Sequence, residues 1–173
     1  MSAPVFEKSP DTVAFRRAMG MFPTGVAVLT AGRDAATVAM TANAVVSISL
    51  DPMLVLISIG ESGRLRGAIE STGGFAVNVL AADQRPLSDL FARRDRPTGH
   101  AAQDVLGSLV GDTGVALVRD AVVSLECETY RQYPGGDHVL FLGRVAALHS
   151  STVDREPLLF HQGGYSSLKK DWS

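Results

Sequence analysis

This sequence of 173 residues has very little cysteine and no marked excess of charge of either sign. Its one cysteine is Cys127, so no disulfide can form within the chain, which suits the reducing cytosol and predicts a cytoplasmic location. Sixteen basic and eighteen acidic side chains give a formal net charge of -2. Nucleic acids and anionic membranes are bound by basic surfaces, so this balance argues against both as partners.

Long apolar runs and the common enzyme motifs are also missing. The run Pro52–Ile57 falls far short of the roughly 20 residues that span a bilayer, and the first residues do not resemble a secretory signal. No G-x-G-x-x-G, P-loop, G-x-S-x-G or H-E-x-x-H motif is present. The four histidines lack the spacing of metal ligands, so no metal site is expected; they are His100, His138, His149 and His161.

The composition is that of an ordinary globular protein, with 46% hydrophobic and 20% charged residues. A chain of this length buries on the order of 70% of its unfolded surface and needs no disulfide or metal for stability. No linker, repeat or low-complexity tract divides it. We therefore expect a single domain over residues 1–173, with residues 1–10 flexible.

The pattern of apolar residues predicts mainly strands. Helices are expected to start at Ser9-Pro10 with Ser9 as cap, at Ser62, and at Asp83 as cap of a helix to Phe91. Expected strands are Val26–Ala31, Thr37–Ala42, Val45–Leu50, Met53–Ile59, Phe75–Leu80, Ala121–Tyr130 and His138–His149, with a short segment at Leu158–Phe160. Without βαβ alternation, this order favours an antiparallel sheet or barrel with peripheral helices.

Two stretches between these elements read as connections. Arg93–Leu117 mixes glycine and proline with a short apolar cluster, and we expect an extended connection with one helical turn at most. Tyr133–Asp137 is a hairpin-type connection between the two longest strands. Within the first of these strands, alternation places Cys127 beside Leu125 and Thr129, which predicts a buried structural thiol.

One segment is suited to holding a flat ligand. Thr41-Ala42-Asn43-Ala44 is followed by Ser47 and Ser49, and small side chains let a planar ring approach the backbone. Backbone groups and the Asn43 amide can then pair with ring heteroatoms. The simpler alternative is a strand with a polar outer face and a turn near Asn43.

Three further segments are suited to a phosphate or a second ring. Gly60–Arg66 leads into a helix start, where Ser62 can cap or bind an anion and Arg64 or Arg66 can add charge. Arg93 and Arg94 follow a predicted helix and can pair with a phosphate. His138 follows Gly136-Asp137. The simpler alternatives are a capped surface helix for the first segment, a solvated helix end for the second and a hairpin turn for the third.

In their order along the chain, these motifs resemble the flavin reductase-like family, the small reductase components of two-component flavin-dependent monooxygenases. The resemblance runs from about Phe15 to Leu168. The matching stretches are Phe15–Gly20, Phe22–Val26, Met40–Asn43, Ser47–Pro52, Phe75–Leu80, Leu87-Ser88, Phe91-Ala92, Gly136–His138, Leu142-Gly143, Pro157–Leu159 and Gly164-Tyr165.

The resemblance implies a mainly β fold, an antiparallel FMN-binding split β-barrel with short peripheral helices, that works as a homodimer. It places Met40, Thr41, Ala42 and Asn43 along the flavin ring, Ser47 and Ile48 by the ring or ribityl chain, Ser62 with Arg93 or Arg94 at the phosphate, and His138 and Tyr165 at the nicotinamide. Three departures from the family pattern are Ala44 in place of a hydroxyl residue, Met53 in place of a second proline, and Asp95–Ala102 in place of a lysine-phenylalanine segment.

The resemblance implies an NAD(P)H:flavin oxidoreductase that supplies reduced FMN or FAD to a partner monooxygenase. Hydride would pass from C4 of NADH or NADPH to flavin N5, so that the cofactors carry the chemistry and the protein positions them. His138 would orient the nicotinamide and would not act as a nucleophile. The alternatives are a flavin-binding or electron-transfer protein of the same fold without nicotinamide turnover, and a split-barrel binder of another ligand such as haem.

Overall fold

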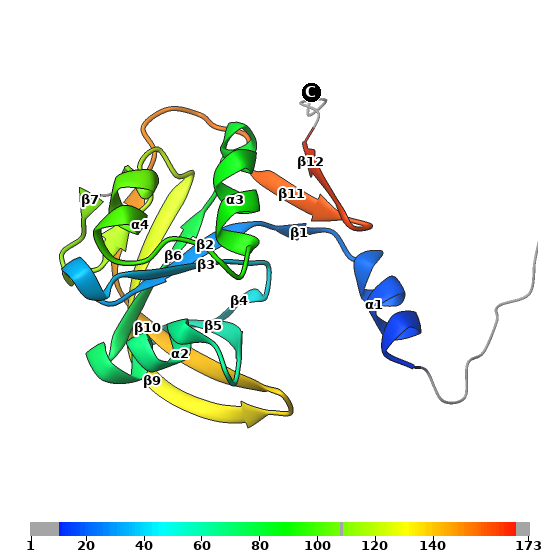
Figure 1. Ribbon diagram of the computed structural model, residues 1–173, viewed down its shortest axis with the longest axis horizontal. Coiled ribbons are helices and arrows are strands. Elements are labelled where there is room, and N and C mark those ends of the chain that lie inside the picture. The colour runs from blue at the N-terminus through cyan, green and yellow to red at the C-terminus, as the bar shows by residue number, and fades with distance from the viewer. Residues whose placement is uncertain (1–10, 108, 169–173) are drawn as a thin grey trace, which may run out of the picture.

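A computed structural model of the chain describes residues 11–107 and 109–168 (Figure 1). The expected flexible segment 1–10, with Ser9 and Pro10, lies outside the described residues. The first helix, α1 (Thr12–Gly20), begins after Asp11, whose Oδ1 accepts hydrogen bonds from Val13 N at 2.9 Å and Ala14 N at 2.8 Å. The predicted start at Ser9 was therefore wrong, because a carboxylate nearer the helix caps it.

Seven strands of the described chain form one sheet in the order β3-β2-β6-β9-β10-β5-β4, and each neighbouring pair is antiparallel. The mainly β, antiparallel fold expected from the sequence is confirmed. In chain order these strands are β2 (Ala27–Ala31), β3 (Val38–Ala42), β4 (Val45–Leu50), β5 (Met53–Gly60), β6 (Gly74–Val79), β9 (Val123–Gly135) and β10 (His138–Ser150).

The sheet is covered on both faces. Along β2, Leu29 faces one apolar core and Val28 faces another, and all five residues of this strand are buried. The helix α2 (Arg64–Thr72) packs on the first core through Leu65 and Ile69 and contacts β2, β3, β5 and β6. These strands stand towards both ends of the strand order, so the sheet curves around this core.

The second core lies beneath α3 (Arg85–Ala92) and α4 (Gly99–Leu106), drawn green in Figure 1. Two of the expected helix N-caps were wrong, one at α2 and one at α3. The α2 helix follows Gly63, not Ser62, and no side chain caps it. Asp83 lies in the short 3-10 helix η2 (Ala82–Gln84) before α3 and pairs with Arg155 at 2.6 Å. A preceding turn thus takes the place of the predicted first turn of α3.

The segment Arg93–Leu117 is more ordered than expected. It contains α4 and a hairpin of two short strands, β7 (Leu109–Val110) and β8 (Ala116–Leu117). The glycines that indicated a loop stand at the two ends of α4, with positive φ values of 61° at Gly99 and 58° at Gly107. The sequence indicates these two ends, but the apolar face between them is too narrow to have predicted a helix.

The connection between β9 and β10 is shorter than predicted. The turn is Gly136-Asp137, and Tyr133–Gly135 continue the strand, with Pro134 opposite Val139. On its other side β9 pairs with β6 only as far as Glu128, so Pro134 stands on an open edge and leaves no ladder hydrogen bond unmade. The small 3-10 helix η1 (Asp34–Ala36) turns the chain from β2 to β3.

A small sheet carries α1 away from the body of the molecule (Figure 1). It consists of β1 (Thr24–Gly25), β11 (Leu158–His161) and β12 (Gly164–Ser167) in the order β1-β11-β12. Gln162, at the β11–β12 turn, donates its backbone N–H to Gly20 O at 2.8 Å and so holds α1. Within the described residues, no helix has the length and apolar character needed to cross a membrane.

Candidate active site

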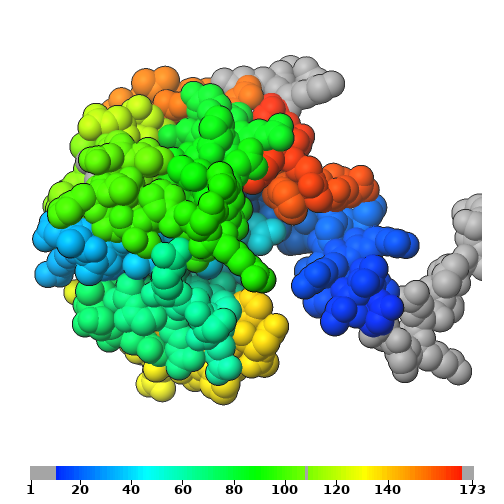
Figure 2. Space-filling view, in the orientation of Figure 1, coloured from blue at the N-terminus to red at the C-terminus, as the bar shows by residue number. Residues whose placement is uncertain are grey.

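Asn43 follows β3 directly and lies where three neighbouring pockets meet. One pocket of about 200 Å³ is shared with Thr41, Ala42 and Tyr165. A second, of about 360 Å³, is shared with Thr24 and apolar side chains of β2 and β6. The third, of about 570 Å³, is the cleft between α1 and β4, which Figure 2 shows beside the blue helix. The Asn43 amide has no hydrogen-bond partner among the described residues, so it is free to bind a ligand.

Tyr165 is held rigidly at the wall of the first pocket. Its hydroxyl lies 2.9 Å from Oγ of Ser88, a fully buried residue of α3. Arg85 stands over the Tyr165 ring at 5.2 Å, and Phe160 meets it edge-on with centroids 5.5 Å apart. Thr41 Oγ1 donates to Ser88 O at 2.7 Å, which ties the same helix to β3. The sequence motif Leu87-Ser88 therefore anchors two walls of the pocket.

The remaining residues expected near the ring lie around this pocket. The Met40 side chain points the other way and packs against the first core, so that its backbone is the part nearest the pocket. Ser47 and Ile48 lie on the exposed side of β4, an edge strand, beside a bulge in its pairing with β5. The structure therefore brings Thr41, Ala42, Asn43 and Tyr165 together and leaves Ser47 and Ile48 further along the edge.

Arginines from two segments meet beside the start of α2. Arg64 donates from Nη2 to Arg94 O at 3.2 Å, and Arg96 donates from Nε to Ala39 O at 2.9 Å and from Nη1 to Arg93 O at 2.9 Å. Burial and the neighbouring charge of Arg64 lower the pKa of Arg96. Within the described chain neither Arg64 nor Arg96 has a carboxylate partner, and two adjacent unpaired guanidinium groups favour an anion.

The predicted phosphate ligands differ in their availability. The side chain of Arg93 forms two hydrogen bonds to Asp95, at 2.7 and 3.0 Å. Arg94 and Ser62 are exposed, and Ser62 lies in the loop before α2. Arg96 was missed, although it follows the arginines that the sequence singled out, because it lies in the segment read as a loop. Its bond to Ala39 places it directly beside Met40.

His138 begins β10, opposite Gly60 of β5. Its Nδ1 lies 2.7 Å from Asp137 Oδ1, and this hydrogen bond is the main cause that lowers the pKa of Asp137. Arg16 of α1 contributes to the same lowering, so the turn faces that helix. Glu61 N donates to Asp137 O at 3.1 Å, which joins the Ser62 loop to the turn. The structure thus brings His138 and the predicted phosphate loop to one end of β5.

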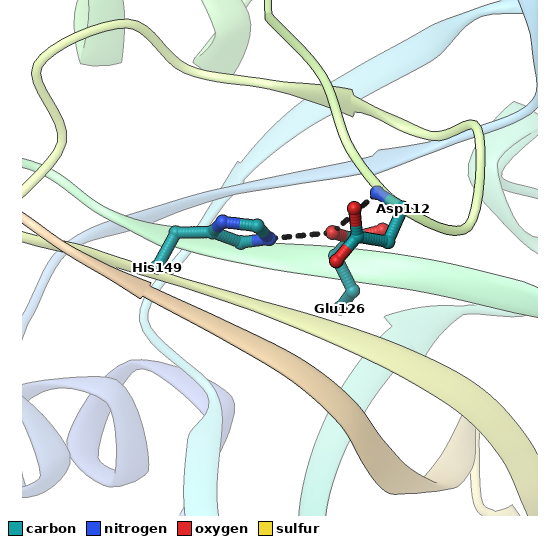
Figure 3. A group of neighbouring side chains, drawn as sticks. All are labelled: Asp112, Glu126 and His149. Atoms are coloured by element: carbon teal, nitrogen blue, oxygen red, sulfur yellow. Dashed lines mark hydrogen bonds and ion pairs between the residues drawn. The ribbon is translucent and has the colours of Figure 1, made fainter.

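A second polar cluster, which sequence spacing did not reveal, lies at the opposite end of β10 (Figure 3). Ligand atoms of Asp112, Glu126 and His149 lie within 4.8 Å of one another. Glu126 is fully buried, and its carboxylate accepts hydrogen bonds from Asp112 N at 2.9 Å, Thr113 N at 2.7 Å and His149 Nε2 at 2.6 Å. The Thr113 hydroxyl donates a further one. Every acceptor position of Glu126 is thus used within the protein.

These contacts make Glu126 a clasp for the β7–β8 loop. Burial raises the pKa of Glu126, but the hydrogen bonds from Thr113, His149 and Asp112 together outweigh it, so the pKa lies below the ordinary value. Gly111 passes so close that a Cβ there would clash with the Glu126 carboxylate. Cys127, which follows Glu126, points to the first core, and burial raises the pKa of its thiol to about 12. The predicted buried thiol is confirmed.

Comparison with known proteins supports the fold and assigns the family. Residues 19–169 match the family described as flavin reductase like domain. The NADH-dependent FMN reductase AsuE2 of Streptomyces nodosus subsp. asukaensis is 55% identical, over 92% of this chain and 86% of its own length. The NADH-dependent FAD reductase of Streptomyces globisporus is 39% identical, over 93% of this chain and 88% of its own.

Solved structures agree. The Streptomyces globisporus NADH:FAD oxidoreductase SgcE6 superposes with a TM-score of 0.87 at 37% identity, covering 98% of this chain and 99% of its own. BorF, the flavin reductase component of a bacterial two-component tryptophan halogenase, gives a TM-score of 0.85 at 38% identity, covering 91% and 98%. The match extends over nearly all of the described fold, including the Asn43 pocket, and the chain belongs to the flavin reductase-like family.

Proposed function

We propose that this protein is an NADH-dependent flavin reductase, with FMN as the preferred flavin. Family membership over residues 19–169, joined to the pocket at Asn43, is the observation that carries the proposal. Its relative AsuE2 is named as an FMN reductase and shares 55% of the aligned residues. The reaction is NADH + H⁺ + FMN → NAD⁺ + FMNH₂.

In this proposal the flavin ring lies along Met40–Asn43. The backbone of this segment and the Asn43 amide pair with the polar edge of the ring, and Ala42 lets the ring approach closely. Ser47 and Ile48 then flank the ring or ribityl chain from β4. Tyr165, fixed by Ser88, closes the opposite side of the pocket and lies towards the nicotinamide.

The phosphate end of the flavin lies at the arginines beside α2. Arg64 and Arg96 are two neighbouring arginines without a carboxylate partner in the described chain, and Ser62 and Arg94 are exposed beside them. Arg93 is less available, because Asp95 already holds it. We therefore assign the phosphate chiefly to Arg64 and Arg96, with Ser62 and Arg94 as further contacts.

His138 orients the nicotinamide. Its Nδ1 is engaged by Asp137, which fixes the ring and leaves Nε2 available towards a ligand. Bound together, the two cofactors supply hydride transfer between nicotinamide C4 and flavin N5. The residues of this site would hold the two rings in position for that transfer, and none of them would be needed as a general acid or base.

Steady-state oxidation of NADH, with and without added FMN, FAD or riboflavin, tests this function. We expect a rate that depends on flavin, fastest with FMN, and a much lower rate with NADPH. A protein that binds FMN tightly without oxidising NADH would instead be a flavin-binding or electron-transfer protein. Absence of both FMN affinity and flavin-dependent turnover would contradict the proposal.

The reduced flavin serves a flavin-dependent monooxygenase component. Relatives named as reductase subunits of flavin-dependent monooxygenases include HsaB of Rhodococcus jostii, which is 34% identical over 93% of this chain. A site formed largely of backbone and small side chains suits a flavin that leaves after reduction. Transfer to an oxygenase is tested by coupling the reductase to such a component and measuring hydroxylation under limiting flavin.

We also propose that two copies of the chain associate as a homodimer. The α1 helix buries no residue, and its apolar side chains are open, with Phe15 60% and Met19 53% exposed. Apolar side chains of β4 are open as well, with Ile48 49% exposed. A nine-residue helix has little stability alone in water, so α1 requires a packing partner, and a second copy supplies one.

Light scattering after size-exclusion chromatography measures this association. The wild-type protein is expected to elute as a dimer, and Phe15→Asp is expected to shift the equilibrium towards monomer. Val105→Asp, at another exposed apolar position far along the chain, is the matched control and should remain dimeric. A monomeric wild-type protein that retains full flavin affinity would contradict the homodimer.

A further inference from the structure

Thr24 belongs to the Phe22–Val26 motif, which has no role in the function proposed so far. Its hydroxyl oxygen is buried and has no hydrogen-bond partner within residues 11–107 and 109–168. Buried hydroxyl groups in proteins are nearly always paired, because an unpaired one has lost its water without replacement. Thr129 Oγ1 is the other side-chain atom of the described chain in this condition.

The surroundings of Thr24 differ from those of Thr129. Thr24 lines two of the three pockets that meet at Asn43, the cavity towards β2 and β6 and the cleft beside α1. Thr129 lies within β9, and its backbone N–H donates to Gly73 O at 2.8 Å. Thr24 therefore lines a cavity, although its hydroxyl oxygen is enclosed, and Thr129 stands in a strand of the large sheet.

The walls around Thr24 are suited to an aromatic ring with a polar edge. Phe22, Val45 and Val77 supply apolar surface, and Asn43 supplies an amide without a partner in the described residues. A hydroxyl can donate one hydrogen bond and accept others, so it can pair with a ring nitrogen, a ring carbonyl or a ring N–H. Thr24 and Asn43 thus offer two polar groups to one ligand.

Rotation about the Cα–Cβ bond of Thr24 can bring the hydroxyl to the cavity. The residue as a whole is partly exposed although its oxygen is enclosed, and a 120° rotation carries the oxygen to the position that the methyl group or the hydrogen held. Because the oxygen has no hydrogen bond to lose, this rotation breaks nothing. Binding of a polar ring edge then satisfies a group that the protein alone leaves unpaired.

From this geometry we infer that Thr24 is a flavin-binding residue whose hydroxyl pairs with the polar edge of the isoalloxazine ring. The inference rests on the proposed flavin reductase function. It adds a contact from β1 to a ring otherwise held by the segment after β3. β1, through Thr24, and the segment after β3, through Asn43, then bind the same ring.

The test compares two threonine-to-valine variants. Thr24→Val removes the hydroxyl and keeps the shape, and Thr129→Val does the same at the matched control position. Removing an unpaired buried hydroxyl does not lower stability, so the melting temperatures of both variants should equal or exceed that of the wild type. The Kd for FMN, measured by quenching of flavin fluorescence without NADH, should rise about 3- to 10-fold for Thr24→Val alone. Thr24→Ser should bind FMN within about twofold of the wild type.

Several results would overturn the inference. Unchanged FMN affinity of Thr24→Val would do so. If the KM for NADH rose instead, the hydroxyl would be assigned to the nicotinamide. If the oligomeric state changed instead, it would be assigned to a contact with a partner subunit. An equal loss of affinity in Thr129→Val would indicate a general structural effect. Failure of the wild-type protein to oxidise NADH with any flavin would refute the proposed function itself, and FMN binding by the valine variants would still decide the role of Thr24.

Discussion

Two polar regions of the molecule, the cluster around Glu126 and the candidate site around Asn43 and Arg96, differ in how far their hydrogen-bonding groups are satisfied. Around Glu126, two backbone N–H groups, a hydroxyl and an imidazole meet one buried carboxylate, and no acceptor is left over. In the candidate site, the Asn43 amide and the Thr24 hydroxyl have no hydrogen-bond partner in the described chain, and Arg64 lies beside Arg96 without a carboxylate. A cluster complete in itself stabilises the fold, and an incomplete one is arranged for a ligand.

The largest expected effect of breaking this contrast is on stability. Glu126→Ala removes the acceptor of the partly buried N–H groups of Asp112 and Thr113 and of the His149 hydrogen bond, and it should lower the free energy of unfolding by about 2–4 kcal/mol. FMN affinity of the folded protein should not change. Urea denaturation and flavin fluorescence measure the two quantities. If the variant lost FMN affinity at unchanged stability, Glu126 would belong to the flavin site and would not hold the β7–β8 loop.

Glu126 also shows where sequence patterns stop being informative. Alternation correctly placed Cys127 in the core, but it gave no sign that the neighbouring Glu126 is buried as well. Glu126 is covered by the β7–β8 loop, which lies 13 and 14 residues earlier in sequence and was read as part of a long connection. Burial of a charged residue depends on such a distant cover, which no local pattern reports.

The strands around the site were easier to predict. Val45–Leu50 was predicted to the residue, because β-branched residues and the flanking Asn43-Ala44 and Asp51-Pro52 define it locally. The arginine arrangement was not, since Arg64 and Arg96 are brought together by the packing of α2 against the segment after α3. Family motifs predicted where a flavin would bind, and tertiary contacts decide which arginines lie beside that segment.

The pH dependence of stability gives a second, smaller test of the clasp. The pKa of Glu126 is lowered below its ordinary value of 4.5, so its contribution to stability is complete above that pH. The contribution is lost as the pH falls through the lower pKa of the folded state. Glu126→Gln cannot titrate, so its unfolding free energy should fall less steeply in acid than that of the wild type. Parallel curves from pH 7 down to about 3 would contradict the shift.

On the incomplete side, Arg96→Gln should raise the KM for FMN about 10-fold, because a charge-assisted hydrogen bond to a phosphate is lost. The rate with riboflavin, which has no phosphate, should stay within about twofold of the wild type. Arg93→Gln is the matched control, since that side chain is already held by Asp95, and its KM for FMN should change little. A larger effect at Arg93 would assign the phosphate to one of the two arginines, Arg93 and Arg94, that the sequence singled out.

The smallest expected effect concerns Tyr165, whose side chain has a hydroxyl paired within the protein and a ring open to the pocket. Its hydroxyl is satisfied by Ser88, and its ring faces the pocket. Tyr165→Phe and Ser88→Ala each remove one neutral hydrogen bond, so each should weaken FMN binding or raise the KM for NADH by about two- to fourfold, with kcat nearly unchanged. Because both variants remove the same bond, the double variant should be no weaker than either single one. Tyr133→Phe, at an exposed position on β9, is the control and should bind FMN as the wild type does. Additive losses in the double variant would show that Ser88 acts through packing of α3 and not by orienting Tyr165.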